Sequence, residues 1–484
     1  MDKNDFTKNL IGFSLLSWIS FGISFLTAPI TTRLYLPSDL GVVNLFSNYS
    51  TLIMAISFFG LDQAYSRFYY SPPRGFNKES LMNYALKNSI FISFIIGLIL
   101  LFFNKQVSME ISGNNSILIV ICLVVTSMTG IIYRYYNLMY RMEMNFKMYT
   151  LQGVAMIFAS KISYIIVGVY ESQFLIAILM ITISQLVVSI IFILIKYLNH
   201  KKKCDNYEIN QVKIDLDLRT IYKFALPLAP VTILSWLNGS ISQLVLRRLL
   251  DFDAIGIFSM AVGLASIINI LQTGFNTFWI PYVYKNYKEK NNNFWQVHKQ
   301  IVSLLTILGL TIIFLQEPLF LLLGEKYRDS SLFFAFLIIP PITYTIAETT
   351  GLGYNLYNKT YWLPMIYVIS AFANVIGAVI LVPIFGITGV AISSALSSIL
   401  SLFFRTYIGE RYYKIVKHYR YIISSLVLVI AASIFSFFLN EIIIWREIAI
   451  LFLIVLSLLI YFKEIKITIK VIILLIFGRK TNLN

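Results

Sequence analysis

Two ionisable residues lie deep inside apolar runs of this sequence. Lys161 sits near the middle of the run 149–169, about twelve residues or ~18 Å of helix rise from the end at residue 149. A charge at that depth costs at least ~2.5–3.5 kcal/mol where it faces lipid, so we expect Lys161 to face a wet cavity or a partner. Glu348, inside the run 332–354, could carry a coupling proton or Na⁺, pair with a basic residue, or be solvated at a membrane interface.

Two further groups of polar residues could contact a ligand. Asn269, Gln272 and Asn276 share one face of the run 255–279 at i, i+3 and i+7, where they could bind hydroxyl groups or join helices. Asp62 and Arg67 follow the run 41–61. They are typical either of a basic loop or of a site for electrostatic capture of an anion.

These residues belong to a chain of 484 residues that is 58% hydrophobic and 13% charged, with mean hydropathy +0.76 and net charge +16. Soluble domains carry about 25% charged residues. The composition therefore excludes a disordered chain, a secreted disulfide scaffold and a soluble nucleic-acid binder. Cys122 and Cys204 form neither a disulfide pattern nor a metal-site pattern. We predict an all-α polytopic membrane protein.

Hydropathy predicts fourteen transmembrane spans. They run near 10–31, 41–61, 83–103, 117–137, 149–169, 174–195, 224–246, 255–279, 299–316, 332–354, 361–382, 386–407, 421–439 and 445–462. The first is too long for a signal peptide and lacks a cleavage pattern, so we expect it to be retained. With a cytoplasmic amino terminus, 31 Lys and Arg residues fall in inside segments and 7 in outside ones. This bias predicts a multi-pass protein with both termini in the cytoplasm.

The span order predicts four parts. Residues 1–195 form an N-lobe, 196–223 a cytoplasmic linker loop, 224–407 a C-lobe, and 408–484 two extra helices with a basic cytoplasmic tail. The linker is the longest interruption between apolar runs and is rich in Lys and Asp.

The two lobes contain an internal repeat. The segment from Arg33 to Gly41 recurs from Arg248 to Gly256, at an offset of 215 residues and with the same Arg-to-Gly spacing. Six helices separate the two copies, which predicts parallel repeats related by an axis along the membrane normal.

Smaller features extend the repeat. Ser38 and Asp253 occupy one register and are both expected to cap the following helix. Gly60 and Gly274 are expected to end that helix in each half. By the same offset, Glu348 falls in the region of Arg134 and Tyr135.

Three segments together resemble the polysaccharide flippase family. They are the Arg-Leu-x5-Leu-Gly hairpin at 33–41, the turn at 383–391, and Phe59-Gly60-Leu61 followed by Ser66-Arg67-Phe68. The resemblance is to the Wzx-type branch of the superfamily that includes multidrug and toxin extrusion (MATE) transporters and the lipid II flippase. It implies a MATE-like pair of six-helix lobes plus two carboxy-terminal helices around a central cavity. It also implies movement of undecaprenyl-diphosphate-linked oligosaccharide to the outer leaflet of the bacterial plasma (inner) membrane.

The resemblance gives the candidate residues specific roles. Lys161 would meet the lipid diphosphate, unless it snorkels or pairs. Arg33, Arg247 and Arg248 would line the outer mouth, where an Arg fork suits a diphosphate; otherwise Arg33 and Arg248 are interfacial anchors beside the capping acids Asp39 and Asp253. The stripe 269–276 would contact sugars. Gly41, Gly256, Gly386 and Gly389 are expected at tight turns and close packing positions rather than at the ligand.

The remaining expectations concern partners and rival classes. We expect no enzyme motif, no cofactor and no metal site. We also expect no nucleic-acid partner. The three His residues are expected in cytoplasmic loops. H⁺ or Na⁺ is a possible coupling ion, and a polysaccharide polymerase a possible partner. The alternatives are a cation-coupled MATE-type drug extruder, against which the first span lacks an acid, and a glycan polymerase or ligase, against which the outside loops are short. A flippase serving O-antigen or capsule assembly is the favoured interpretation.

Overall fold

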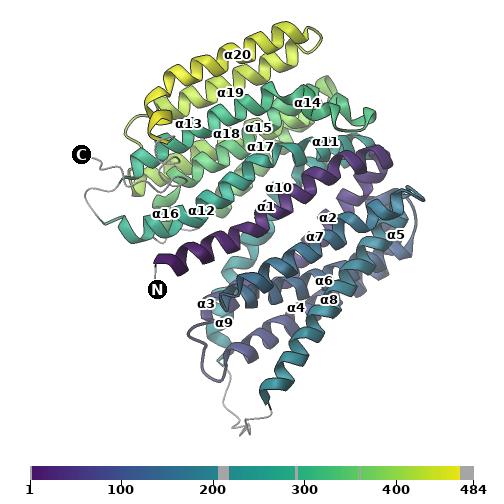
Figure 1. Ribbon diagram of the computed structural model, residues 1–484. Coiled ribbons are helices and arrows are strands. Elements are labelled where there is room, and N and C mark those ends of the chain that lie inside the picture. Colours follow the sequence, from purple (N-terminus) through teal and green to yellow (C-terminus); the bar gives the residue numbers. More distant parts are fainter. Residues whose placement is uncertain (1–2, 205–216, 289–292, 358, 360, 469–484) are drawn as a thin grey trace. The chain divides into compact units, whose positions relative to one another are not determined.

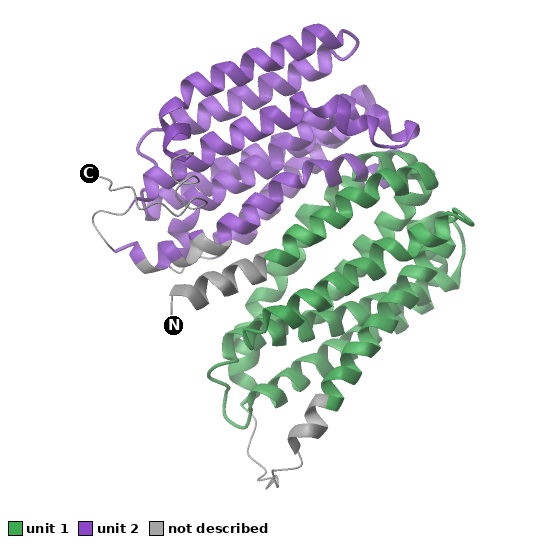
Figure 2. Cartoon of the chain, viewed as in Figure 1, with its two compact units in different colours: residues 1–243, 251–259 green, residues 244–250, 260–484 purple. Residues whose placement is uncertain are grey.

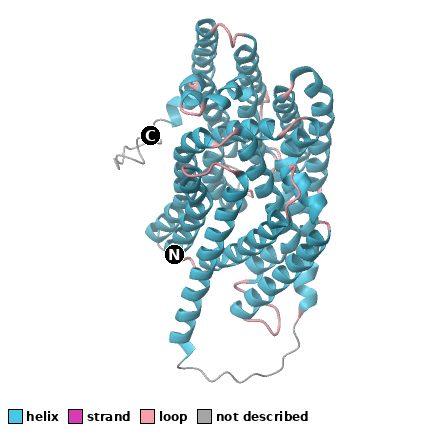
Figure 3. Ribbon diagram, turned by 90° about the vertical axis from the view of Figure 1, so that its right-hand side faces the viewer, coloured by secondary structure: helices cyan, strands magenta, loops and turns pink. Residues whose placement is uncertain are grey.

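The computed structural model describes residues 3–204, 217–288, 293–357, 359 and 361–468. These residues form long α-helices joined by short loops and contain no strand (Figures 1 and 3). The helices of the first half are α1 Lys3–Leu34, α2 Pro37–Phe58, α3 Leu61–Phe68, α4 Lys78–Phe102, α5 Asn104–Ser112, α6 Ile117–Met142, α7 Phe146–Gly168, α8 Phe174–Cys204, α9 Leu218–Ala225 and the 3₁₀ turn η1 Leu226–Leu228.

The second half continues the same pattern. It contains α10 Ala229–Leu249, α11 Phe252–Ala265, α12 Ile267–Asn286, α13 Phe294–Phe314, α14 Gln316–Leu321, the 3₁₀ helix η2 Glu325–Ser330, α15 Ser331–Thr350, α16 Leu352–Leu356, α17 Trp362–Phe385, α18 Ile387–Tyr412, α19 Arg420–Phe438 and α20 Ile443–Ile460.

Among the described residues, 13 helices are long and apolar enough to cross a membrane, or 14 when α11 and α12 count as one broken span. The two halves of that span meet at Ser266 with a bend of 47°. The predicted all-α polytopic fold with about fourteen spans is thereby confirmed.

The chain forms two compact units (Figure 2). Unit 1 comprises residues 1–243 and 251–259, and unit 2 comprises residues 244–250 and 260–484. Helix α8 extends to Cys204 and α9 begins at Leu218, so helix occupies both ends of the predicted linker 196–223. Residues 205–216 and the tail 469–484 lie outside the described residues.

Unit 1 is built around α6, which packs against α2, α4, α7 and α8. A cluster of buried aromatic and aliphatic side chains, including Tyr65, Tyr135 and Ile131, surrounds the second half of α6. The short helix α9 closes this end of unit 1, because it packs against α3. We call this the α3 end of unit 1, and the opposite end, where α5 lies, the α5 end.

Unit 2 is built around α15, whose spanning window is 78% buried. It packs against α12, α13, α18 and α19. The last two helices, α19 and α20, pack on each other and on α13. Their contacts therefore continue the unit rather than forming a separate domain.

Helices α2 and α11 cross with their backbones in contact inside unit 1. A Cβ atom at Gly41 would lie 2.0 Å from the carbonyl oxygen of Phe252, and one at Gly256 would lie 1.9 Å from that of Pro37. Gly41 and Gly256 are 215 residues apart, and so are Pro37 and Phe252. The crossing therefore pairs equivalent residues of the internal repeat, and the predicted packing role of both glycines is confirmed.

The capping predicted from the repeat is wrong. Helix α2 starts at Pro37 after Leu36, with no side-chain cap. Ser38 therefore lies inside the first turn. In the second copy Asp251, not Asp253, caps α11, because its carboxylate accepts a hydrogen bond from the Ala254 amide at 2.8 Å. Asp39 instead accepts from the Phe174 amide at 3.2 Å, at the start of α8, where a helix N-terminus favours a negative group.

The predicted correspondence of Gly60 and Gly274 is also wrong. Gly60 has φ +76° and turns the chain from α2 into α3, a conformation that glycine adopts without strain. Gly274 lies inside α12. The repeat therefore diverges after its first hairpin, since the second copy continues as a bent helix where the first copy turns.

We predict that Gly41→Ala and Gly256→Ala each destabilise the protein. The added methyl group must displace backbone atoms of the opposing helix, and such overpacking costs about 1–3 kcal/mol. Gly239→Ala in α10 is the matched control, because a Cβ there meets nothing within 4 Å. Thermal unfolding of the purified protein in detergent should show lower midpoints for the first two variants only. Equal midpoints for all three would rule out a close crossing.

Candidate functional site

Lys161 lies in the part of α7 nearer to the α5 end of unit 1. It is seven residues from the end of the helix at Gly168, or roughly 10 Å of rise, and therefore lies beyond the predicted mid-span position. Its side chain is half-buried. No hydrogen bond or ion pair holds its ammonium group within the part of the chain that the structure describes.

Hydroxyl and amide groups lie next to Lys161 on α7 and on the neighbouring α8. Ser160 accepts a hydrogen bond from the Gln185 amide at 2.7 Å. Ser184 donates to the Ala159 carbonyl at 2.7 Å. The interface of α7 and α8 is therefore polar at the level of Lys161, although both helices are long and apolar.

The amide stripe lies on α12 of unit 2, beyond the bend at Ser266. Asn269 is exposed, whereas Gln272 and Asn276 are half-buried. The side-chain oxygen of Asn276 is buried and has no hydrogen-bond partner among the described residues. Gly274 on the same helix faces open space. This part of α12 therefore presents polar groups that the described chain does not fully use.

The arginines predicted at the outer mouth occupy the last turns of two helices. Arg33 ends α1 in unit 1 and is exposed. Arg247 and Arg248 end α10 in unit 2, where Arg247 is half-buried and Arg248 exposed. Arg67, predicted at the opposite mouth, is exposed on α3, with its guanidinium 5.8 Å from the ring centre of Phe68.

Asp62 forms an ion pair inside unit 1. Its buried carboxylate accepts a hydrogen bond from the Arg134 guanidinium at 3.1 Å. The surrounding segment 61–68 is the helix α3 rather than a loop. One carboxylate oxygen of Asp62 has no partner among the described residues. Asp62 therefore ties α3 to α6, whereas Arg67 on the same helix remains exposed.

Glu348 forms an ion pair inside unit 2. Its carboxylate accepts a hydrogen bond from the Arg405 guanidinium at 2.7 Å, and Arg405 also donates to the Tyr354 hydroxyl at 3.2 Å. Arg405 is only 6% exposed and lies within the spanning helix α18. It therefore lies inside the helix bundle of unit 2 and not in a loop.

Two other polar residues of unit 2 are also buried in helices. Arg446 is fully buried in α20 and lies 2.8 Å from Glu317 of unit 2. His298, expected in a loop, is buried in α13, with its Nδ1 2.7 Å from the Thr349 hydroxyl. Polar residues near helix ends can thus lie inside the bundle, and hydropathy alone does not separate them from loop residues.

The comparisons with known proteins identify the family. The family model described as "Polysaccharide biosynthesis protein" matches residues 6–287, more than half of the chain. The chain belongs to this family. The resemblance drawn from the motifs is thereby confirmed, and the protein is a multi-pass membrane protein of this polysaccharide biosynthesis family.

A curated relative supports the same family. The capsular polysaccharide biosynthesis protein CapF of Staphylococcus aureus is 25% identical over 202 residues. The match covers 40% of this chain and 50% of CapF, so the chain spans about half the length of that relative.

Solved structures show that the family member shares a transporter fold. The lipid II flippase MurJ has a TM-score of 0.68 at 14% identity, with 93% of this chain and 97% of MurJ covered. A multidrug resistance MATE family transporter of the MOP superfamily has a TM-score of 0.56 at 15% identity, with 81% and 94% covered. These likenesses establish the MATE-like fold and leave the substrate to be argued from this chain.

We predict that Glu348→Gln lowers the stability of this family member, because it leaves Arg405 buried without its partner. Breaking a buried pair costs about 3–5 kcal/mol, whereas replacing both partners with uncharged groups costs far less. The double variant Glu348→Gln/Arg405→Met should therefore unfold at a higher temperature than Glu348→Gln alone.

The matched control is Arg411→Met, because Arg411 is an exposed residue of α18, the helix that contains Arg405. It should leave the unfolding midpoint unchanged. If the double variant unfolded at a lower temperature than both Glu348→Gln and Arg405→Met, the two side chains would stabilise the protein through more than their ion pair.

Proposed function

We propose that this protein is a flippase for undecaprenyl-diphosphate-linked oligosaccharide. It moves repeat units from the cytoplasmic to the outer leaflet of the bacterial plasma (inner) membrane by alternating access of a central cationic cavity, and supplies O-antigen or capsule assembly. Support comes from the family match, from the name of the capsular relative, and from a fold shared with a lipid II flippase.

The observation that carries the proposal is the state of Lys161. A lysine in a spanning helix is costly unless it meets water, a partner or an anionic ligand. Here Lys161 is half-buried at the level of the Ser160–Gln185 hydrogen bond, and its ammonium group has no partner in the described chain. A lipid diphosphate supplies the missing charge during passage, and its oxygens accept short, charge-assisted hydrogen bonds from the lysine.

The other candidate residues serve the two ends of the transport path. Arg33, Arg247 and Arg248 offer guanidinium groups that suit the release of a diphosphate, and Arg67 attracts the substrate electrostatically at the loading side. Asn269, Gln272 and Asn276 bind sugar hydroxyls. Of these, Asn276 has a buried side-chain oxygen with no hydrogen-bond partner among the described residues.

The orientation follows from the distribution of Lys and Arg. Short loops on one side of the membrane hold most of the basic residues, and such loops stay in the cytoplasm. Both termini and the α3 end of unit 1 are then cytoplasmic. A polysaccharide polymerase that acts on exported repeat units is the natural partner on the other side.

Coupling to H⁺ or Na⁺ would involve Glu348. One oxygen of its carboxylate accepts from Arg405 at 2.7 Å, so a coupling cation at Glu348 would compete with this pair. The MATE-type alternative has the shared fold in its favour. Against it stand the family match and the lack of acidic residues between Leu15 and Leu34 of α1.

Deletion of the gene tests the function directly. The flippase proposal predicts that lipid-linked single repeat units accumulate on the cytoplasmic face, as measured by extraction and mass spectrometry of lipid-linked saccharides. A normal surface glycan together with increased drug sensitivity would instead support a drug extruder.

We predict that Lys161→Ala abolishes export of repeat units at normal protein levels, because the diphosphate loses its only charged contact in α7. Lys161→Arg should retain part of the activity, since the charge is kept. Lys105→Ala, an exposed lysine at the α5 end, is the control and should export normally. Surface glycan and lipid-linked intermediates are measured in the deletion strain carrying each variant. Unimpaired export by Lys161→Ala would refute the assignment.

A further inference from the structure

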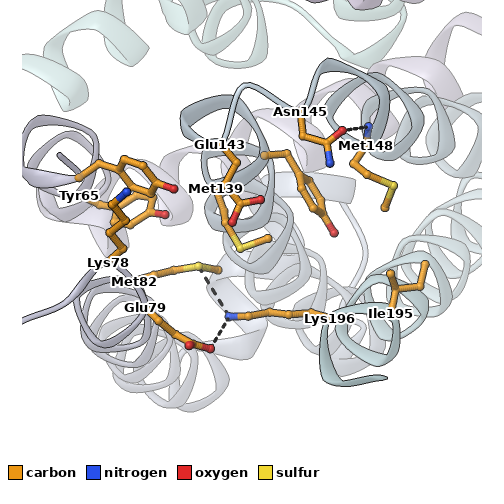
Figure 4. A pocket seen from close by; sticks show the side chains of 12 residues that line it. Tyr65, Lys78, Glu79, Met82, Met139, Glu143, Asn145, Met148, Ile195 and Lys196 are labelled. Carbon is orange, nitrogen blue, oxygen red and sulfur yellow. Dashed lines mark hydrogen bonds and ion pairs between the residues drawn. The ribbon is translucent and has the colours of Figure 1, made fainter. Parts of the chain in front are cut away.

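A cavity of about 400 Å³ lies within unit 1, at the α3 end. It is lined by residues of α3, α4, the end of α6, the start of α7 and α8, and it is open to the outside (Figure 4). Its floor contains Tyr65, Met82 and Tyr140, all of which are buried. None of the transport residues proposed above lines it. The cavity therefore needs an explanation of its own.

The basic side chains of the cavity come from α4 and α8. Lys78 lies with its Nζ 4.8 Å from the ring centre of Tyr69. Lys196 reaches from α8 toward α4, where its Nζ is 3.9 Å from a Glu79 oxygen and 3.8 Å from the sulfur of Met82 (Figure 4). Two ammonium groups therefore border the same space.

The acidic side chains balance them. Glu79 borders the cavity beside Lys196, and Glu143 follows the end of α6 and faces it beside Met139 (Figure 4). Burial, and then the nearby Glu143 carboxylate, raise the pKa of Tyr69, which places that carboxylate close to the tyrosines. With two lysines and two glutamates, the lining has no net charge. A simple anion would be repelled by the glutamates and a simple cation by the lysines.

The mouth of the cavity lies at the level where spanning helices end. Lys78 is the first residue of α4, and Lys196 is close to the end of the spanning part of α8 at Leu198. Beside Lys196, the apolar side chains of Leu194 and Leu198 are 53% and 58% exposed. Charged headgroups and the start of acyl chains meet at such a level of a membrane.

We infer that this cavity binds the headgroup of a zwitterionic phospholipid that carries a primary amine, of the phosphatidylethanolamine class. The phosphate lies between Lys78 and Lys196, and the ammonium group donates to Glu143 beside the tyrosine rings, which also attract a cation. The acyl chains lie along Leu194 and Leu198 of α8. This site is separate from the proposed transport path and takes a resident lipid of the bilayer.

The experiment measures lipid retention by the purified full-length protein in detergent, using native mass spectrometry. Dioleoyl phosphatidylethanolamine, phosphatidylcholine and phosphatidylglycerol are each added at equal concentration. The ethanolamine lipid should be retained about tenfold or more over phosphatidylglycerol, since a charge-assisted hydrogen bond contributes at that scale. Phosphatidylcholine should fall between them, because its ammonium group has no N–H donor. Equal retention of all three, or preference for phosphatidylglycerol, overturns the inference.

Two variants locate the site. Glu143→Gln, at an exposed position, should abolish the preference for ethanolamine over glycerol headgroups. Lys196→Gln should weaken retention of every phospholipid. Lys147→Gln, an exposed lysine of α7 outside the cavity lining, is the control and should behave as wild type. Wild-type retention by both Glu143→Gln and Lys196→Gln would place the lipid elsewhere and overturn the inference.

A competition experiment distinguishes a site for the whole lipid from a site for its soluble headgroup. Free phosphoethanolamine, added in excess, should not displace the bound lipid, because it lacks the acyl chains that contact α8. Displacement would identify a site for a small soluble zwitterion and would overturn the lipid assignment. The readout is binding rather than export, so its outcome is independent of the proposed flippase activity.

Discussion

The arrangement of charges in both units follows from one constraint, which is that an ionised side chain inside an apolar helix must be paired, hydrated or bound to a ligand. Arg134 meets this requirement through Asp62, and Arg405 through Glu348. Each pair joins the central helix of its unit, α6 or α15, to a neighbour. Helix α6 contributes the cation of its pair and α15 the anion, and the partner residues lie on α3 and α18. The two units therefore meet the same requirement with different pairs of helices.

The crossing of α2 and α11 shows a second way in which the repeat is used. Gly41 and Gly256 remove the side chains at the point where the helix backbones meet, and the contacting carbonyl groups belong to the equivalent residues Pro37 and Phe252. Because the contact is symmetric, a larger residue on either side disturbs the same interface. Packing thus explains why a glycine occupies the same place in both hairpins.

Much of the fold could be predicted from the sequence, because its signals are local. Hydropathy needs only the residues of one helix to locate a span, and the spacing from Arg33 to Gly41 recurs in the second half of the sequence. Pairing partners are not local: Asp62 and Arg134 are 72 residues apart, and Glu348 and Arg405 are 57 apart. Arg134 and Arg405 nevertheless lay inside the predicted runs 117–137 and 386–407, and this position within an apolar run was the available signal that each needs a partner. The cavity at the α3 end could not be predicted, since five helices contribute to it.

The contrast between Lys161 and the paired charges bears on substrate choice. A fold shared by a lipid II flippase and a multidrug transporter does not determine what is carried. Charges that the described protein neutralises internally cannot also provide strong contacts to a substrate without first breaking their pairs. Lys161, whose ammonium group has no partner among the described residues, meets an incoming anion at no such cost. In the proposed path its charge therefore selects an anionic headgroup, and the amide groups of α12 are left to recognise the uncharged part of the cargo.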